Sequence, residues 1–93
     1  TNTMTKTYLI GYDLNKSGQD YSTLIEKIKE LGDWWHCLDS AFIIKSTSTS
    51  ISIRDYLTNF IDVNDELLVV GLNGEAAWRG FNSECSNWLK NNL

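Results

Sequence analysis

The segment TYLIGYDL, residues 7–14, decides the fold of this chain. It is rich in aromatic and β-branched residues, as β-strands are. Its apolar residues fall on both faces of the expected strand, so we expect a central strand with both faces covered. Farther along the chain, residues 34–45 predict either one long bent strand or two strands joined near Asp39 and Ser40, and residues 66–72 predict a last buried strand.

A helix is expected between the first two of these segments. From residue 21 to residue 31 the apolar positions are separated by gaps of 3, 1, 3 and 3, which is a helical stripe. Ser17 or Asp20 can cap its start, and Gly32 suits the left-handed residue at its end.

A weaker helical stripe covers residues 51–61, and the five serine and threonine residues at 46–50 predict a loop that leads into a helix cap. In the tail, residues 82–93, helical spacing predicts a short helix that includes Cys85, Trp88 and Leu89. The resulting order is β-α-β-β-α-β plus a tail. This order predicts an α+β fold, a ferredoxin-like βαββαβ sandwich with an antiparallel sheet and a short C-terminal helix.

The sheet of such a fold is covered by helices on one face only. Because the expected strands are apolar on both sides, the other face needs a cover as well. A second copy of the chain in a twofold homodimer is the simplest cover. The tail is the other candidate.

Length and composition fit one globular domain, since the 93 residues include 42% hydrophobic and 22% charged residues. We expect a single domain over residues 7–93, including the tail, and expect residues 1–6 to be disordered or left over from cloning. No apolar run approaches the ~20 residues that span a bilayer, and residues 1–7 lack the apolar stretch of a signal peptide. No membrane partner is therefore expected.

The cysteine content bears on the cellular compartment of the protein, and the net charge bears on the class of ligand. Cys37 and Cys85 are too few for a disulfide framework and are expected to be free thiols in a reducing cytosol, with a disulfide as the alternative. This predicts a cytoplasmic protein. The net charge of −4 argues against broad binding to a nucleic-acid backbone. It leaves room for a local basic patch, a bound metal or a small ligand.

Several short segments carry a resemblance to a known family. They are Tyr12–Leu14, Leu31–Gly32, Asp39–Ile43 and Asp65–Val70. Over residues 7–72 the chain resembles the small CRISPR-associated ferredoxin-like endonuclease family and its VapD relatives. A nearer resemblance is to an uncharacterised SinR-like branch of small bacterial proteins, on the segments Tyr12–Asn15, Trp34–His36 and Ala77–Gly80.

The resemblance implies a homodimeric, nucleic-acid-associated protein, either a metal-dependent endonuclease or a relative that has lost catalysis. In the resembled family, the aspartates that match Asp13 approach each other across the dimer and are proposed to hold a divalent metal, which here would be Mg²⁺ or Mn²⁺. Such a cation prefers carboxylate oxygens and can activate water for attack on a phosphodiester. The alternative is that Asp13 only caps the turn at Leu14 and Asn15.

His36 is the single histidine and the second candidate for catalysis. It could act as a general base near neutral pH or contact a ligand. It could equally be a structural residue that a backbone carbonyl holds in place. Alternation along the strand places His36 on the face of Trp34, opposite to Trp35 and Cys37.

The candidates for binding a nucleotide or another ligand are Trp35, Trp78, Arg79 and Ser40. A tryptophan beside an arginine can stack on a nucleobase while the guanidinium binds a phosphate. Alternatively, Trp78 fills the edge of a small core or a dimer seam. Ser40 matches a serine step of the resembled family. The arginines that this family carries in its first helix and before that serine are absent here, which favours the alternative function, a non-catalytic module that binds a nucleotide or a protein.

Overall fold

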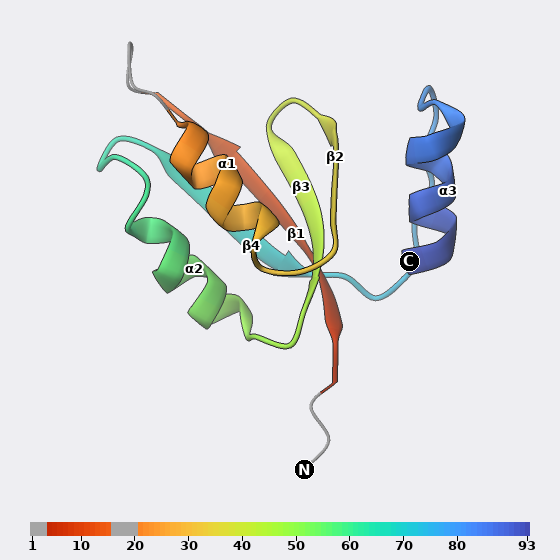
Figure 1. Ribbon diagram of the computed structural model, residues 1–93, viewed down its shortest axis with the longest axis horizontal. Coiled ribbons are helices and arrows are strands. Elements are labelled where there is room, and N and C mark those ends of the chain that lie inside the picture. Colours follow the sequence, from red (N-terminus) through yellow and green to blue (C-terminus); the bar gives the residue numbers. More distant parts are fainter. Residues whose placement is uncertain (1–3, 16–20) are drawn as a thin grey trace.

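The computed structural model describes residues 4–15 and 21–93 (Figure 1). Along the chain the elements are strand β1 (Lys6–Asp13), helix α1 (Ser22–Lys29), strands β2 (Trp34–Leu38) and β3 (Ala41–Ser46), helix α2 (Ser50–Thr58), strand β4 (Glu66–Gly71) and helix α3 (Ser83–Asn92). The described residues therefore form a small α+β fold with a four-stranded antiparallel sheet and three helices. The helix caps expected at Ser17 and Asp20 lie outside the described residues.

The sheet has the order β2-β3-β1-β4, so β1 is central, as its composition predicts. The register places Gly11 of β1 opposite Ala41 of β3, and Asp13 opposite Glu66 of β4. Helix α1 connects β1 to β2, which have β3 between them, and α2 connects β3 to β4, which have β1 between them. Each of these helices thus joins two parallel strands that flank an antiparallel one.

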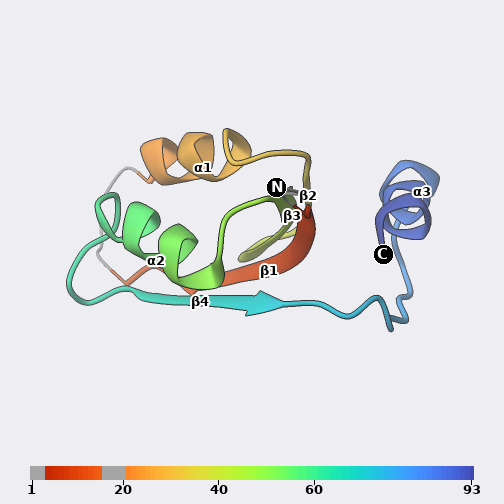
Figure 2. The same cartoon turned by 90° about the horizontal axis from the view of Figure 1, so that it is seen from below.

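The main core lies between the sheet and helices α1 and α2, which cover the same face of the sheet (Figure 2). The predicted helical stripes are the faces that point into this core. Helix α1 contributes Leu24 and Ile28, and helix α2 contributes Ile53 and Leu57, all of them inaccessible to solvent or nearly so. The strands supply the other buried members, Tyr8, Ile10, Tyr12, Phe42 and Ile44.

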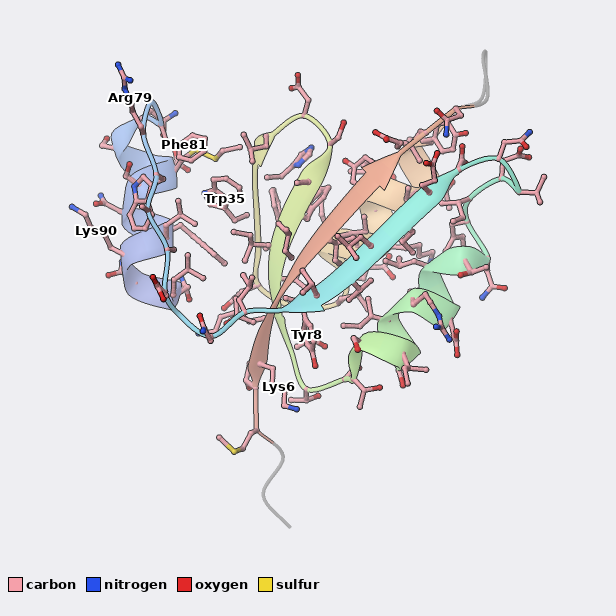
Figure 3. The ribbon with its side chains drawn as sticks, turned by 180° about the vertical axis from the view of Figure 1, so that it is seen from behind. Lys6, Tyr8, Trp35, Arg79, Phe81 and Lys90 are labelled. Atoms are coloured by element: carbon pink, nitrogen blue, oxygen red, sulfur yellow. A yellow bond between two sulfur atoms is a disulfide. The ribbon has the colours of Figure 1, made fainter. Side chains whose placement is uncertain are left out.

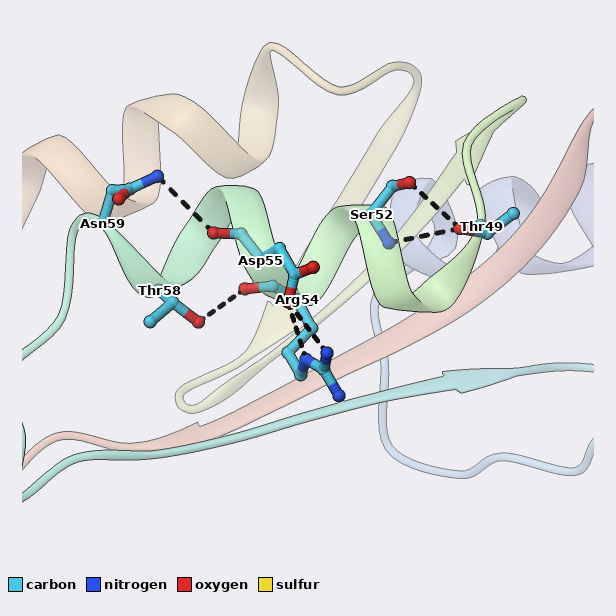
Figure 4. Close-up of polar contacts among 6 residues, drawn as sticks. All are labelled: Thr49, Ser52, Arg54, Asp55, Thr58 and Asn59. Atoms are coloured by element: carbon cyan, nitrogen blue, oxygen red, sulfur yellow. Dashed lines mark hydrogen bonds and ion pairs between the residues drawn. The ribbon is translucent and has the colours of Figure 1, made fainter.

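Thr49 caps helix α2, within the run of serine and threonine residues that predicts a cap. Its Oγ1 accepts a hydrogen bond from the backbone N–H of Ser52 at 3.1 Å (Figure 4). This bond satisfies one of the N–H groups that the first turn of a helix leaves unpaired. Near the other end of α2, the Thr58 hydroxyl donates to the backbone carbonyl of Arg54 at 2.7 Å. Ser46, by contrast, is not part of the loop but the buried last residue of β3.

Gly32 does not have the helix-ending role that the sequence suggests. Helix α1 ends at Lys29, and its C-cap, Glu30, has right-handed backbone geometry. Gly32 has a φ of +154°, and a Cβ atom there would collide with the backbone carbonyl oxygen of Lys45. In the loop after α1, the backbone carbonyl of Asp33 accepts a hydrogen bond from the backbone N–H of Lys45 at 2.9 Å. The glycine is therefore required because this loop passes against β3.

Strand β4 is an edge strand, and the expectation of a buried strand is wrong for one of its faces. Leu67 and Val69 pack against the main core, whereas Leu68 is 59% exposed and Val70 is 39% exposed. At the other end of the chain, β1 begins at Lys6, one residue before the expected start of the domain.

The C-terminal segment, residues 72–93, covers part of the second face of the sheet. Leu9 of β1, Trp35 of β2 and Ile43 of β3 belong to a second hydrophobic cluster with residues of this segment. Helix α3 stands beyond β2, apart from α1 and α2 (Figures 1 and 2). Of the two covers that the sequence suggests, the tail is thus the one present within a single chain. Across the described residues, no helix is long and apolar enough to cross a membrane.

Gly32→Ala is expected to lower the free energy of unfolding by about 1–3 kcal/mol for the unfavourable φ alone, with a further cost for displacing the Lys45 carbonyl. Gly11→Ala is the matched control, because no atom lies within 4 Å of its Cβ position. The control should be neutral or stabilising by up to about 1 kcal/mol. Urea unfolding followed by circular dichroism measures both. Equal stabilities of the two variants would contradict the role given to Gly32.

Candidate functional site

The second hydrophobic cluster is the place where predicted ligand-binding residues meet. Its buried members are Trp35, Ile43 and Leu89, which come from β2, β3 and α3. Partly buried residues from β1, β2 and the C-terminal segment surround them, namely Leu9, Cys37, Leu72, Trp78, Phe81, Cys85, Trp88 and Leu93. The cluster therefore joins the sheet to a segment that is distant in sequence from most of it.

Trp35 is the main anchor of this cluster. Its side chain is only 4% exposed. The ring meets Phe81 edge to face, with the ring centroids 5.0 Å apart (Figure 3), and the indole N–H donates a hydrogen bond to the backbone carbonyl of Cys85 at 3.1 Å. One side chain thus supplies apolar area and a polar contact across the same interface.

A disulfide joins Cys37 of β2 to Cys85 in the first turn of α3, so the expectation of two free thiols is wrong. Cys37 lies two residues beyond Trp35 and therefore on the same face of the strand. Helix α3 begins directly against that face, which brings the two Cα atoms to 6.4 Å, within the range of a disulfide. Disulfides are typical of oxidising compartments, so this bond gives no support to the expected reducing cytosol.

A pocket of about 270 Å³, here called the interface pocket, lies between the second face of the sheet and the C-terminal segment. The sheet side is lined by Leu9, Trp35 and Ile43, and the other wall by Ala77, Trp78 and Phe81. These side chains are all apolar or aromatic. The pocket thus offers flat hydrophobic surfaces for a small ring system.

Arg79 is the charged residue at the rim of the interface pocket. Its side chain is exposed, and the guanidinium extends outward from the C-terminal segment (Figure 3). Within residues 4–15 and 21–93, no carboxylate forms an ion pair with it. The neighbouring Trp78 is half-buried, and its indole N–H donates to the Ser86 hydroxyl at 3.2 Å, which fixes the ring against α3. Three of the predicted ligand residues, Trp35, Trp78 and Arg79, therefore surround one pocket.

His36 lies on the opposite face of the sheet, as alternation along β2 predicts. Its ring stacks on Phe42 of the main core, with centroids 3.8 Å apart and an interplanar angle of 1°. Its Nδ1 lies 2.9 Å from the backbone carbonyl oxygen of Ala41, so the geometry calls for a proton on Nδ1. This is the structural arrangement that the sequence left open as the alternative to a general base.

Asp13 is exposed at the end of β1, directly opposite Glu66 of β4. The turn beyond it is held by Asn15, whose backbone N–H donates to the Asp65 carboxylate at 2.7 Å and whose side-chain amide donates to Glu66 Oε1 at 2.6 Å. Among the described residues, no group of three or more His, Cys, Asp or Glu side chains is placed to hold a metal ion. A single chain thus brings the carboxylates of Asp13, Asp65 and Glu66 to this end of the sheet without arranging them as a metal site.

Ser40 lies beside the end of β1 and does not line the interface pocket. It is exposed in the turn between β2 and β3, and its backbone carbonyl accepts a hydrogen bond from the Tyr12 N–H at 3.1 Å. The Tyr12 hydroxyl makes a long, 3.4 Å contact with the backbone carbonyl of Asp39. Burial raises the pKa of the Tyr12 hydroxyl above its usual value of 10.0, and the negative charge of Asp39 raises it further. Asp13 and His36, the two candidates for catalysis, point to opposite faces of the sheet and do not form a joint site.

Sequence reasoning missed Phe81 as part of this site and gave the disulfide only as the alternative to two free thiols. The even number of cysteines was the available signal for the disulfide. Phe81 had no distinguishing pattern around it, because its role depends on where the C-terminal segment returns to the sheet.

Trp35→Ala is expected to lower the free energy of unfolding by about 3–5 kcal/mol, because it removes a large buried ring and the bond to Cys85. Trp34→Ala is the matched control in the adjacent position. The Trp34 ring is 42% exposed and contacts Lys29 at 4.5 Å, so its removal should cost about 1 kcal/mol. Thermal unfolding under oxidising conditions compares them, and similar losses in both variants would contradict the anchoring role of Trp35.

No protein-family model matches this sequence, and no solved structure matches the chain. Its function has therefore to be inferred from the contacts, burial and charges described above.

Proposed function

We propose that this chain is a non-catalytic binding module that holds a mononucleotide, with the base in the interface pocket. The observation that carries the proposal is the meeting of Trp35, Trp78 and Phe81 around a pocket of about 270 Å³ with Arg79 at its rim. Aromatic walls favour a flat ring, since stacked and edge-to-face contacts both suit a nucleobase.

Charge decides between a mononucleotide and a polymer. The chain has a net charge of −4, which disfavours a long phosphate backbone. One phosphate needs only a local cation, and Arg79 is exposed and without an acidic partner among the described residues. A guanidinium pairs well with phosphate oxygens. The pocket volume lies just below the usual range of ligand sites, which fits a single ring system.

The proposal predicts that AMP or another nucleoside monophosphate binds the oxidised protein and changes its tryptophan emission. Arg79→Ala should weaken binding about 10- to 100-fold, because a charge-assisted hydrogen bond is lost. Ala77→Leu should abolish it by filling the pocket. Lys90→Ala is the matched control, since Lys90 is also an exposed cation of the C-terminal segment but does not line the pocket. Isothermal calorimetry with the four common nucleoside monophosphates measures the affinities. Absence of binding by all four, or equal affinities in all variants, would overturn the proposal.

We also propose that residues 6–71 form a ferredoxin-like βαββαβ domain. The observed support is the element order up to β4 and the two interleaved units in which α1 and α2 each connect parallel strands around a third strand. This proposal agrees with the resemblance to the CRISPR-associated family, which shares that architecture.

A second candidate function is that of the resembled family, a homodimeric nuclease that uses Mg²⁺ or Mn²⁺. One specific observation favours it: Asp13 and Glu66 face each other on the part of the sheet that the C-terminal segment leaves uncovered, beside the exposed Leu68 and Val70. A twofold pairing over this patch would bury the apolar side chains and bring carboxylates of two copies together. The ion would polarise a phosphodiester and lower the pKa of a bound water.

This second candidate predicts cleavage of labelled RNA or DNA in the presence of Mn²⁺ by a protein of dimer mass. Asp13→Ala should reduce the rate at least about 100-fold, because a metal ligand is lost. Asp33→Ala is the control, since Asp33 is likewise exposed but lies in the loop before β2. A monomer that cleaves nothing, or equal cleavage by the two variants, would remove this candidate.

A further inference from the structure

We propose that the Cys37–Cys85 disulfide is a reversible lock on the interface pocket, so that thiol reductants release α3 and open the pocket. The inference rests on the proposed function in so far as it names nucleotide binding as the property under control. The release of α3 itself depends only on the contacts of the C-terminal segment.

The disulfide lies where it can control the pocket. It joins two residues that are 48 positions apart and fastens the first turn of α3 to the middle of β2. The pocket wall opposite the sheet comes entirely from the C-terminal segment, including Trp78 and Phe81. Movement of α3 together with the rest of the C-terminal segment away from β2 would therefore remove these side chains from the pocket.

The non-covalent attachment of α3 to the sheet depends on the second hydrophobic cluster. Leu89 is the one residue of α3 that is fully buried among those described. The hydrogen bond from the Trp35 indole reaches α3 at the carbonyl of Cys85 itself. Other polar contacts of this helix, such as the bond from Trp78 to Ser86 and the cap from Asn82 to the Cys85 N–H, stay within the C-terminal segment. The segment is therefore held together internally, and the hydrophobic cluster around Trp35 and Leu89, with the Trp35 hydrogen bond, attaches it to the sheet.

The disulfide lies beside a cavity that a small thiol can enter. Cys37 and Cys85 are both only partly buried. They line an open cavity of about 430 Å³ together with Trp34, His36, Glu84 and Trp88. A cavity of this size admits a small thiol, whereas a disulfide inside a close-packed core is shielded from attack.

The chemistry of release is thiol–disulfide exchange. A thiolate attacks one sulfur of the Cys37–Cys85 bond, forms a mixed disulfide and expels the other cysteine as a thiolate. A second thiol then attacks the mixed disulfide. The two cysteines gain two electrons and two protons overall, and the two reductant thiols are oxidised to one disulfide. Reoxidation by a disulfide of the same class reverses each step.

Reduction should loosen α3 while the main core stays folded. Helices α1 and α2 pack on the other face of the sheet, around residues such as Leu24 and Leu57 that do not contact the C-terminal segment. Opening of α3 alone is thus a local unfolding event. It would leave Leu9, Trp35 and Ile43 as an exposed apolar patch and remove Arg79 from its place at the rim.

Amide hydrogen exchange followed by mass spectrometry tests the lock on the full chain, with and without dithiothreitol. On reduction, exchange of residues 83–92 should rise on the order of 100-fold or more, while exchange of residues 50–58 in α2 stays unchanged. The double variant Cys37→Ser/Cys85→Ser is the matched control. It should show the fast α3 exchange in both conditions, because it has no disulfide to reduce. Alkylation and intact mass confirm that two thiols are released.

Each outcome decides the proposal. It is overturned if α3 stays protected after full reduction, if α2 loses protection together with α3, or if dithiothreitol releases no thiols from the folded protein. Isothermal calorimetry with AMP on the oxidised and the reduced protein distinguishes failure of the lock from failure of the proposed nucleotide binding. Affinity that falls at least 10-fold on reduction supports both ideas. Equal affinity in the two forms overturns the lock and leaves nucleotide binding intact. Fast α3 exchange on reduction without AMP binding by either form supports release of α3 and overturns nucleotide binding.

Discussion

The apolar character of β1 on both of its faces is the constraint on which the rest of the structure depends. Tyr8, Ile10 and Tyr12 point toward α1 and α2, while Leu9 points the other way. A strand of this kind is stable in water only when both faces are covered, since exposed apolar area costs roughly 25 cal/mol per Å². Two helices, α1 and α2, cover the first face. The second face has only the C-terminal segment, so its cover is partial.

The candidate site follows from that partial cover. A single helix standing beside β2 contacts the sheet through a few large side chains, with Trp35 at the centre. Space remains between these contacts, and the interface pocket is that space. Its walls are aromatic because the same residues attach the segment to the sheet. Stability and binding thus depend on one set of side chains, whereas the polar residues at the end of the sheet near Asp13 contribute little to the core.

Much of the fold could be predicted from local pattern alone. Spacing identified both core helices and the short helix at the end of the chain, and the two-faced composition of residues 7–14 indicated the central strand. The serine and threonine run predicted a cap that Thr49 provides. The site was less accessible to prediction because it depends on contacts between distant segments. The need for glycine at position 32 comes from a backbone carbonyl of β3. The burial of Trp35 depends on a segment some 50 residues later in the chain. The disulfide depends on the direction in which α3 returns to β2. Trp78 and Arg79 were predicted as ligand residues, but their neighbours could not be read from sequence.

The same disulfide also has a mechanical consequence. The bond closes residues 37–85 into a covalent ring that contains β3, α2 and β4. Tension applied to the two ends of the chain passes through the sulfur atoms and bypasses everything inside the ring. The 48-residue stretch corresponds to about 160 Å of extended chain that cannot be pulled out while the bond is intact. In the oxidised form, only the first strand, the first helix, part of β2 and most of α3 can be unravelled by force. The reduced form exposes the whole chain to extension.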